Sequence, residues 1–245
     1  AELPKLFRTM PRNTYGVREL PEFMSATAPA AFCYPGSLKT GIPGYFMVNT
    51  MQLDQRPKYG MVSLTLHESV PGHHFQLSIA DELAGLHEFR TLMGYTAFVE
   101  GWALYTERLG LEMSAEHAEG GDRSRGFYAD PYDNFGRLSD EMWRACRLVV
   151  DTGLHAYKWP RQKALDYMLA NTAGTETDLS SEVDRYIGWP GQACAYKIGE
   201  LKIREMRLRA EQSLGEKFDL RAFHDELLGG GALPLPVLET RIIRW

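Results

Sequence analysis

Residues 67–74 of the chain read His-Glu-Ser-Val-Pro-Gly-His-His, and residues 98–105 read Phe-Val-Glu-Gly-Trp-Ala-Leu-Tyr. Zinc sites of hydrolases hold the ion with three protein ligands, often imidazole and carboxylate groups, and leave one position for water. A glutamate directly after a ligand histidine is then free to act as general base on that water. The two stretches therefore predict a zinc hydrolase, with Glu68 as the base and with His67 and Glu100 among the ligands.

The spacing of the second histidine departs from the usual pattern, in which the second ligand lies four residues after the first on the same helical face. That position holds Pro71, which cannot ligate and disfavours the α conformation at the residue before it. The sequence predicts a helix over residues 61–70, a turn or bulge at residues 71–72, and a helix that resumes at His73. We favour His73 as the ligand. His74 is the alternative, and otherwise it is expected to line the site.

A second helix is expected over residues 95–109, despite Gly101. Glu100 and Glu107 fall on one face of this helix. A carboxylate from a second helix would complete the zinc site, which is the role expected of Glu100. Glu107 could accept a hydrogen bond from the second ring nitrogen of a ligand histidine. Its alternative is a surface ion pair with Arg108.

Two later stretches contain groups that could act on the transition state or on the substrate. Amide hydrolysis passes through an oxyanion, which a neighbouring hydrogen-bond donor stabilises. Tyr196 is the first candidate for this donor and His155 the second. Arg185 and Lys197 are candidates for binding a substrate carboxylate. The alternatives are a core aromatic for Tyr196, a helix-end residue for His155 and a structural ion pair for Arg185.

Composition excludes several classes of protein. The chain has 245 residues, of which 44% are hydrophobic and 24% charged, enough for one sizeable core or two small ones. Its net charge of −5 and its interspersed charges predict no nucleic-acid partner, and no apolar run is long enough to span a membrane. Three widely spaced cysteines predict buried apolar side chains rather than disulfides: Cys33, Cys146 and Cys194. Three histidines are expected to be ordinary core residues: His87, His117 and His224.

Prolines and glycines divide the chain into two regions. Residues 1–50 read as short β and loop structure, in which Tyr45–Val48 is a strand. It could be an edge strand that pairs with an extended peptide, or it could serve only as scaffold. Residues 60–245 read as helical, with apolar periodicity over 75–86, 138–150, 164–169, 193–209 and 220–228. The sequence therefore predicts a mainly α fold with a small N-terminal β element, in one catalytic domain over residues 1–245. The chain begins at Ala1 without a signal-like segment, as a processed or trimmed product would, and no compartment is predicted.

Four ordered stretches resemble one known family. They are HESVPGHH (67–74), EGWALYTERLG (100–110), RLVVDTGLH (147–155) and EVDRYIGWPGQACAYKIG (182–199). They resemble the bacterial family catalogued as domain of unknown function 885, over essentially the whole chain. That family is similar to zincin-like, gluzincin-type peptidases, whose metal is held by two histidines and a downstream glutamate.

The resemblance implies a zincin-like helical fold, with zinc held by His67, His73 and Glu100 and with Glu68 as the base. It also implies that the chain is the C-terminal, metal-bearing half of a longer protein. The missing N-terminal half would then be a partner of this domain and would supply further helices.

Three functions remain open from the sequence. The first is a zinc-dependent peptidase that acts on a peptide or a small amide. The second is a metal-dependent hydrolase of a non-peptide amide or ester, since nothing in the sequence fixes the bond that is cut. The third is a non-catalytic metal-binding module, against which the intact Glu68 argues.

Overall fold

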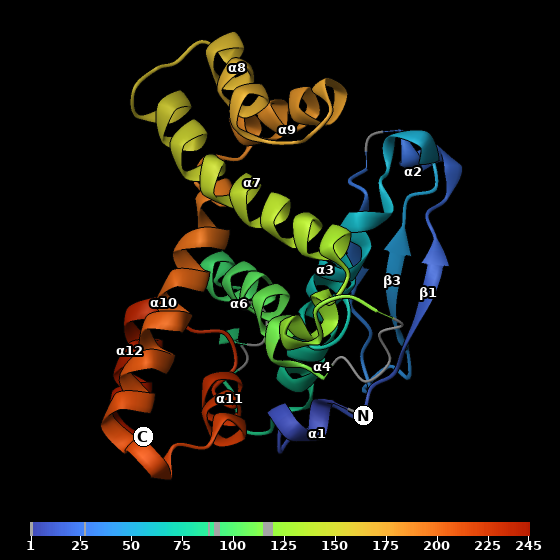
Figure 1. Ribbon diagram of the computed structural model, residues 1–245. Helices are drawn as coiled ribbons and strands as arrows, with labels where there is room; N and C mark the ends of the chain where they lie inside the picture. Colours follow the sequence, from blue (N-terminus) through green and yellow to red (C-terminus); the bar gives the residue numbers. More distant parts are fainter. Residues whose placement is uncertain (1, 27, 88, 91–93, 115–119) are drawn as a thin grey trace.

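The computed structural model describes residues 2–26, 28–87, 89–90, 94–114 and 120–245 (Figure 1). It is mainly helical, with 65% helix and 7% strand, which confirms the predicted fold class. The small sheet lies on one side of α3 and α4, and the long helices α6, α7 and α10 lie on the other (Figure 1). In the described part of the chain, no helix has both the length and the apolar character needed to cross a membrane.

The sheet has three strands in the order β1-β3-β2, namely β1 Tyr15–Glu19, β2 Ala31–Tyr34 and β3 Gly44–Val48. β1 is parallel to β3, and β2 is antiparallel to it, with Cys33 opposite Phe46. The predicted strand over residues 45–48 is confirmed as β3. The idea that β3 is an edge strand is wrong, because β3 is flanked on both sides. β2 is an edge strand, and it packs beside α3.

The predicted helical ranges 138–150, 164–169, 193–209 and 220–228 lie within α7, α8, α10 and α11. α7 starts before its predicted range because the Asp130 side chain caps it, accepting from the Tyr132 amide at 2.7 Å, and Pro131 suits the first helical position. α4 ends four residues before the predicted residue 86. The helix bounds are α1 Leu3–Leu6, α2 Glu22–Ser25, α3 Met61–Glu68, α4 His73–Glu82, α6 Thr96–Leu109, α7 Pro131–His155, α8 Arg161–Asn171, α9 Glu176–Gly188, α10 Gln192–Leu214, α11 Leu220–Leu228 and α12 Leu235–Arg244. The 3₁₀ turns are η1 Leu53–Gln55, η2 Lys58–Gly60, η3 Gly110–Glu112, η4 Arg123–Tyr128 and η5 Gly215–Lys217.

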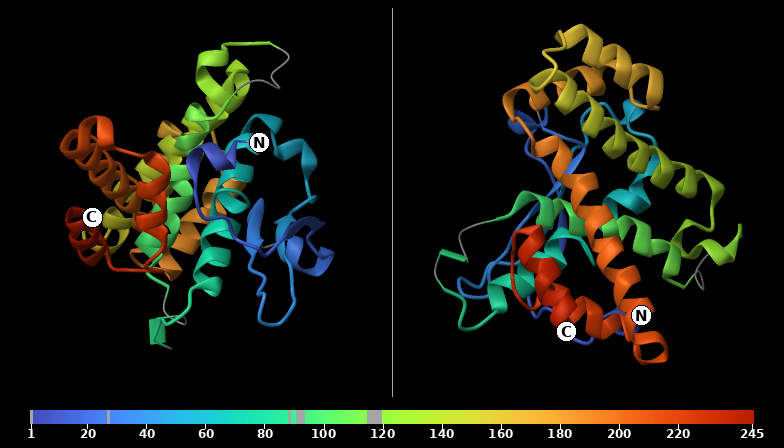
Figure 2. Two further views of the ribbon diagram at one scale, coloured as in Figure 1. Left: turned by 90° about the horizontal axis from the view of Figure 1, so that it is seen from below. Right: turned by 90° about the vertical axis from the view of Figure 1, so that its left-hand side faces the viewer.

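Two hydrophobic clusters stabilise the fold. One surrounds Trp102 and joins α4, α6, α10, α11 and α12, and the other surrounds Met168 and joins α7, α8 and α9. α10 contributes to both, because it runs from the α8/α9 end of the molecule to the α12 end (Figures 1 and 2). α8 and α9 project beyond the rest of the molecule at the end of α7 (Figure 1).

The remaining histidines and the cysteines follow the predictions in part. His224 is a core residue, as predicted, with its ring nitrogens 2.8 Å from the Leu6 carbonyl oxygen and 2.9 Å from the Tyr105 hydroxyl. The prediction for His87 is wrong, because its side chain is exposed beyond the end of α4. His117 lies outside the described residues. All three cysteines are free; Cys146 is buried, and the other two are half-buried.

α6 and α10 cross at two glycines. A Cβ atom on Gly101 would lie 2.4 Å from the Cα atom of Gly199, and a Cβ atom on Gly199 would lie 1.9 Å from the carbonyl oxygen of Ala97. Side chains larger than hydrogen therefore do not fit between these two backbones. The close approach places the first turns of α10 directly beside Glu100 on α6.

The crossing predicts a large effect of Gly199→Ala. The added methyl group must push the two helices apart, and over-packing of this kind costs about 1–3 kcal/mol, with backbone clashes at the upper end. We expect the free energy of unfolding, measured with urea, to fall by about 3 kcal/mol. Gly188→Ala is the matched control, because no atom lies within 4 Å of the Cβ position there. Equal stability of the two variants would contradict the close crossing.

Candidate metal centre

The stretch between α3 and α4 is a break in the helix. α3 ends at Glu68, two residues earlier than predicted, and α4 begins at His73, as predicted. The Val70–Pro71 peptide bond between them is cis. Gly72 is required at the end of the break, since a Cβ atom there would lie 1.9 Å from the carbonyl oxygen of His67. The chain therefore folds back tightly enough to place the first residue of α4 beside the last turn of α3.

Side chains of α6 satisfy the carbonyl groups that the break exposes. The Trp102 indole N–H donates to the Pro71 carbonyl at 2.9 Å, and the Thr106 hydroxyl donates to the Leu66 carbonyl at 3.0 Å. Trp102 and Thr106 are fully buried, so these hydrogen bonds form away from water. The helix that carries Glu100 therefore also fixes the shape of the break.

His67, Glu68 and His73 converge at this break. Each offers one ligand atom, and these atoms lie within 4.8 Å of one another. The rings of His67 and His73 are nearly perpendicular, with centroids 4.7 Å apart. All three side chains are buried. Such a group could hold a metal ion.

Glu100 completes the group from α6. Its Oε2 atom lies 3.6 Å from His67 Nε2 and 3.3 Å from His73 Nε2. Hydrogen bonds from N–H groups to oxygen are shorter, roughly 2.7–3.2 Å. Ligand atoms held about 2.0–2.1 Å from a tetrahedral zinc ion lie roughly 3.3–3.4 Å apart. Glu100 Oε2 is also buried without a hydrogen-bond partner among the described residues. The two histidines and Glu100 therefore fit a zinc ion.

Glu68 differs from Glu100 in its surroundings. Its Oε2 atom accepts a hydrogen bond from the backbone N–H of Cys33 on β2 at 2.8 Å. Glu68 thus has a fixed orientation at the side of the group, whereas Glu100 faces both histidines. The two carboxylates therefore differ in what they face: β2 holds one oxygen of Glu68, and both imidazoles lie beside Glu100.

Glu107 lies on the far side of His67, about two turns along α6 from Glu100. Its Oε1 atom lies 2.7 Å from His67 Nδ1 and accepts from the Arg144 guanidinium at 3.0 Å. Glu107 is 1% exposed, so the alternative of a surface ion pair is wrong. Arg144 is paired in turn with Asp140, 3.1 Å away on α7. The hydrogen bond to Nδ1 leaves Nε2 of His67 directed at Glu100.

The charges around the group favour a cation at its centre. Burial acts to lower the pKa of His67, but Glu100 and Glu107 raise it to about 9. Burial acts to raise the pKa of Glu100, but His67 and His73 lower it well below its ordinary value. The acidic residues therefore stabilise positive charge between the imidazoles, and two imidazoles with a carboxylate are a donor set that zinc prefers.

His74 does not line the site, so that prediction is wrong. Its Nε2 atom donates to the Asn13 carbonyl at 3.3 Å, and its ring packs 4.9 Å from that of Tyr15. Burial lowers the pKa of His74. Adjacent residues of a helix point about 100° apart. When His73 faces the group, His74 must therefore face the sheet.

Tyr196 lies beside the group, in the first turns of α10. Its ring is nearly parallel to that of His67, with centroids 6.1 Å apart. Gln192, one turn earlier, donates to the Tyr196 hydroxyl at 3.0 Å and to Glu100 Oε1 at 3.3 Å. The sequence reasoning missed Gln192, although its spacing of four residues from Tyr196 places both side chains on one helical face. It also missed Arg147, whose guanidinium carbon lies 4.5 Å from the centre of the Tyr196 ring.

The other predicted site residues are placed differently. His155 is not brought to the group: its Nε2 atom lies 3.0 Å from the Tyr186 carbonyl oxygen. α7 continues for eleven residues beyond Arg144, which carries His155 about 16 Å along the helix. Lys197 is buried in ion pairs with Glu141 and Glu200, so it is not free to bind substrate. Arg185 is partly exposed, forms the structural ion pair that was its alternative, with Glu182 at 2.9 Å, and also donates to the side-chain oxygen of Gln192 at 2.9 Å.

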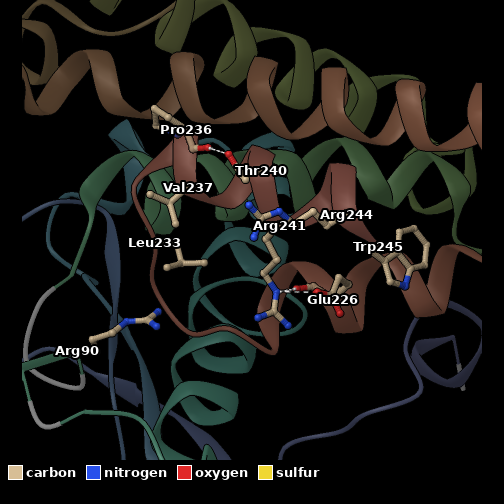
Figure 3. Close-up of a pocket in the computed structure, with 9 residues that line it drawn as sticks. All are labelled: Arg90, Glu226, Leu233, Pro236, Val237, Thr240, Arg241, Arg244 and Trp245. Carbon is tan, nitrogen blue, oxygen red and sulfur yellow. Dashed lines mark hydrogen bonds and ion pairs between the residues drawn. The ribbon is translucent and has the colours of Figure 1, made fainter.

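A separate cavity of about 700 Å³ lies between α11 and α12 (Figure 3). Its lining includes Arg90, Arg241 and Trp245, and the Arg241 side chain points to Glu226 (Figure 3). The lining contains none of the residues that converge on Glu100.

Comparison with known proteins agrees with this arrangement of helices. The chain is similar to "the putative lipoprotein from Colwellia psychrerythraea", a crystal structure with 38% sequence identity and a TM-score of 0.91, over 99% of this chain. The structure of "a putative lipoprotein of unknown function from Shewanella oneidensis" shares the fold, with 24% identity and a TM-score of 0.77 over 97% of this chain. The chain spans 40% and 42% of the lengths of these two proteins. A search of curated proteins found no match.

A family model described as "Bacterial protein of unknown function (DUF885)" matches residues 1–242. The match includes α3 and α4, which carry the two histidines, and α6, which carries Glu100. It also includes the Gln192–Tyr196 turn of α10. The chain therefore belongs to the DUF885 family of bacterial proteins.

Proposed function

We propose that this chain is the metal-bearing domain of a zinc-dependent peptidase. The observation that carries the proposal is the convergence of His67, His73 and Glu100, at distances suited to one tetrahedral ion, with Glu68 beside them. The ligand set of two histidines and a downstream glutamate resembles that of gluzincin-type peptidases. The Pro-Gly insertion in the motif is accommodated by the break between α3 and α4.

The proposed reaction is hydrolysis of an amide bond. When bound, zinc would supply Lewis-acid polarisation of the scissile carbonyl group and would lower the pKa of a coordinated water molecule. Glu68 would accept the proton of the attacking water and pass it to the leaving amine. The Cys33 N–H holds one oxygen of Glu68, which orients the other for this transfer.

Tyr196 is the proposed donor to the oxyanion. Burial raises the pKa of Tyr196, so its hydroxyl keeps its proton at neutral pH and can donate a hydrogen bond. Gln192 fixes the position of this hydroxyl by donating to it from one turn earlier. The proton of the hydroxyl is therefore free to point toward a substrate.

The position of the sheet edge favours a peptide as the substrate over a non-peptide amide or ester. The Cys33 N–H points to Glu68 instead of to β3, so the outer edge of β2 faces the histidine group. An exposed strand edge pairs naturally with an extended peptide through main-chain hydrogen bonds. β2 would hold the substrate along the group through main-chain groups other than the Cys33 N–H, which Glu68 occupies. This is the role that the sequence suggested for the neighbouring strand β3.

The ligand assignment predicts which histidine is needed for zinc. We expect one zinc ion per chain in the full-length protein. His73→Gln should weaken zinc binding by more than the roughly 10–100-fold that loss of an outer hydrogen-bond partner costs. His74→Gln is the matched control, since His74 is an adjacent buried imidazole that faces the sheet, and it should retain zinc. For both variants, elemental analysis measures the zinc content, and competition with a chelator measures the zinc affinity. Loss of zinc in the His74 variant alone would overturn the assignment.

The role of Glu68 predicts the effect of Glu68→Gln. The amide cannot accept a proton, so turnover should fall by about 10²–10⁴-fold, while zinc content remains that of the wild type. The measurement is digestion of a peptide library by the full-length protein, followed by mass spectrometry. Glu107→Gln is a useful comparison. It should lower zinc affinity more than it lowers the turnover of protein that is fully loaded with zinc. Near-normal hydrolysis by Glu68→Gln would show that another group is the base.

A further inference from the structure

We propose that Arg185 binds the C-terminal carboxylate of the substrate, so that the enzyme removes residues from the end of a peptide. The inference rests on the proposed function, because the histidine group would cut the bond. It is carried by the charge balance around Glu182 and by the position of Arg185 next to Gln192.

Two arginines share the carboxylate of Glu182. Arg147 Nη2 lies 2.8 Å from Glu182 Oε2, and Arg185 Nη2 donates to the same oxygen at 2.9 Å. Burial acts to raise the pKa of Glu182, but Arg147 and Arg185 lower it to about 2, so this carboxylate is charged at neutral pH. The three side chains together therefore carry one positive charge. A carboxylate from a substrate would neutralise it.

This excess charge lies one side chain away from the metal centre. Arg185 Nη1 donates to the side-chain oxygen Oε1 of Gln192 at 2.9 Å, and the side-chain nitrogen Nε2 of Gln192 donates to Glu100 Oε1 at 3.3 Å. An extended peptide advances about 3.3 Å per residue. A carboxylate bound by Arg185 would therefore place a bond about one or two residues from the end of the peptide at the histidine group.

Arg185 is also more accessible than the other cations near the group. Its side chain is 30% exposed, compared with 9% for Arg147 and 10% for both Arg144 and Lys197. Arg144 and Lys197 are each matched by two acidic residues. A guanidinium group has five N–H donors, and the described hydrogen bonds of Arg185 use three of them. Arg185 therefore has exposed surface and donors with the geometry that binds a carboxylate.

The test compares N-acetylated peptides that end in a free carboxylate with the same peptides ending in an amide. Binding is measured with the zinc-loaded, full-length Glu68→Gln protein, and hydrolysis with the wild type. We expect the free acids to bind roughly 10–100-fold more tightly than the amides, as a charge-assisted hydrogen bond would give. Products should lack one or two C-terminal residues. Adding Arg185→Gln should reduce acid binding to the level of the amides, so that the preference for free acids is lost.

Arg161→Gln is the matched control. Arg161 also binds a carboxylate of α9, that of Asp184, but its described hydrogen bonds do not reach Gln192. This variant should keep the preference for free acids. Equal binding of acids and amides, or a preference that survives Arg185→Gln in protein with normal zinc content, would overturn the proposal while the peptidase function stands. Failure of the wild type to hydrolyse any peptide would overturn the proposed function instead, and binding to Glu68→Gln would still report on Arg185.

Discussion

The contact of α6 with its neighbours determines the geometry of the whole histidine group. α6 donates hydrogen bonds through Trp102 and Thr106 to the break between α3 and α4, and it carries both Glu100 and Glu107. On its other side it meets α10 at a glycine crossing, which brings Gln192 against Glu100. A shift of α6 would therefore change the ligand distances, the shape of the break and the position of Tyr196 together.

Buried charged side chains hold the histidine group in place, and their removal from water costs free energy. Glu107 and Arg144 are taken out of water beside His67, which is unfavourable unless each charge finds a well-placed partner; the half-buried Asp140 is a second partner of Arg144. Removing one partner of such a set usually destabilises a protein more than the pair itself stabilises it. The network also joins α7 to α3 and α6, so that the helix carrying Arg144 is held in place by the same charges that orient a ligand histidine.

Local sequence signals predicted the centre of the site but not its surroundings. Pro71 and the histidine spacing were enough to predict a break and a restart at His73, because both follow from backbone chemistry over a few residues. The neighbours of the group depend on contacts between distant segments. Gln192 comes near Glu100 only through the glycine crossing, and His155 was misplaced because α7 continues straight past the group. The order of the strands, with β2 at the edge, likewise depends on pairing between short segments with weak signals.

The break between α3 and α4 brings two helix ends of opposite polarity to one point. His67 lies in the last turn of α3, at the negative end of that helix dipole. His73 is the first residue of α4, at the positive end of the second dipole. The backbone field at the group therefore runs from α4 toward α3. It favours a cation near His67 and negative charge near His73. A reaction that moves electrons onto an oxygen on the α4 side would be assisted by the backbone itself, independently of any side chain.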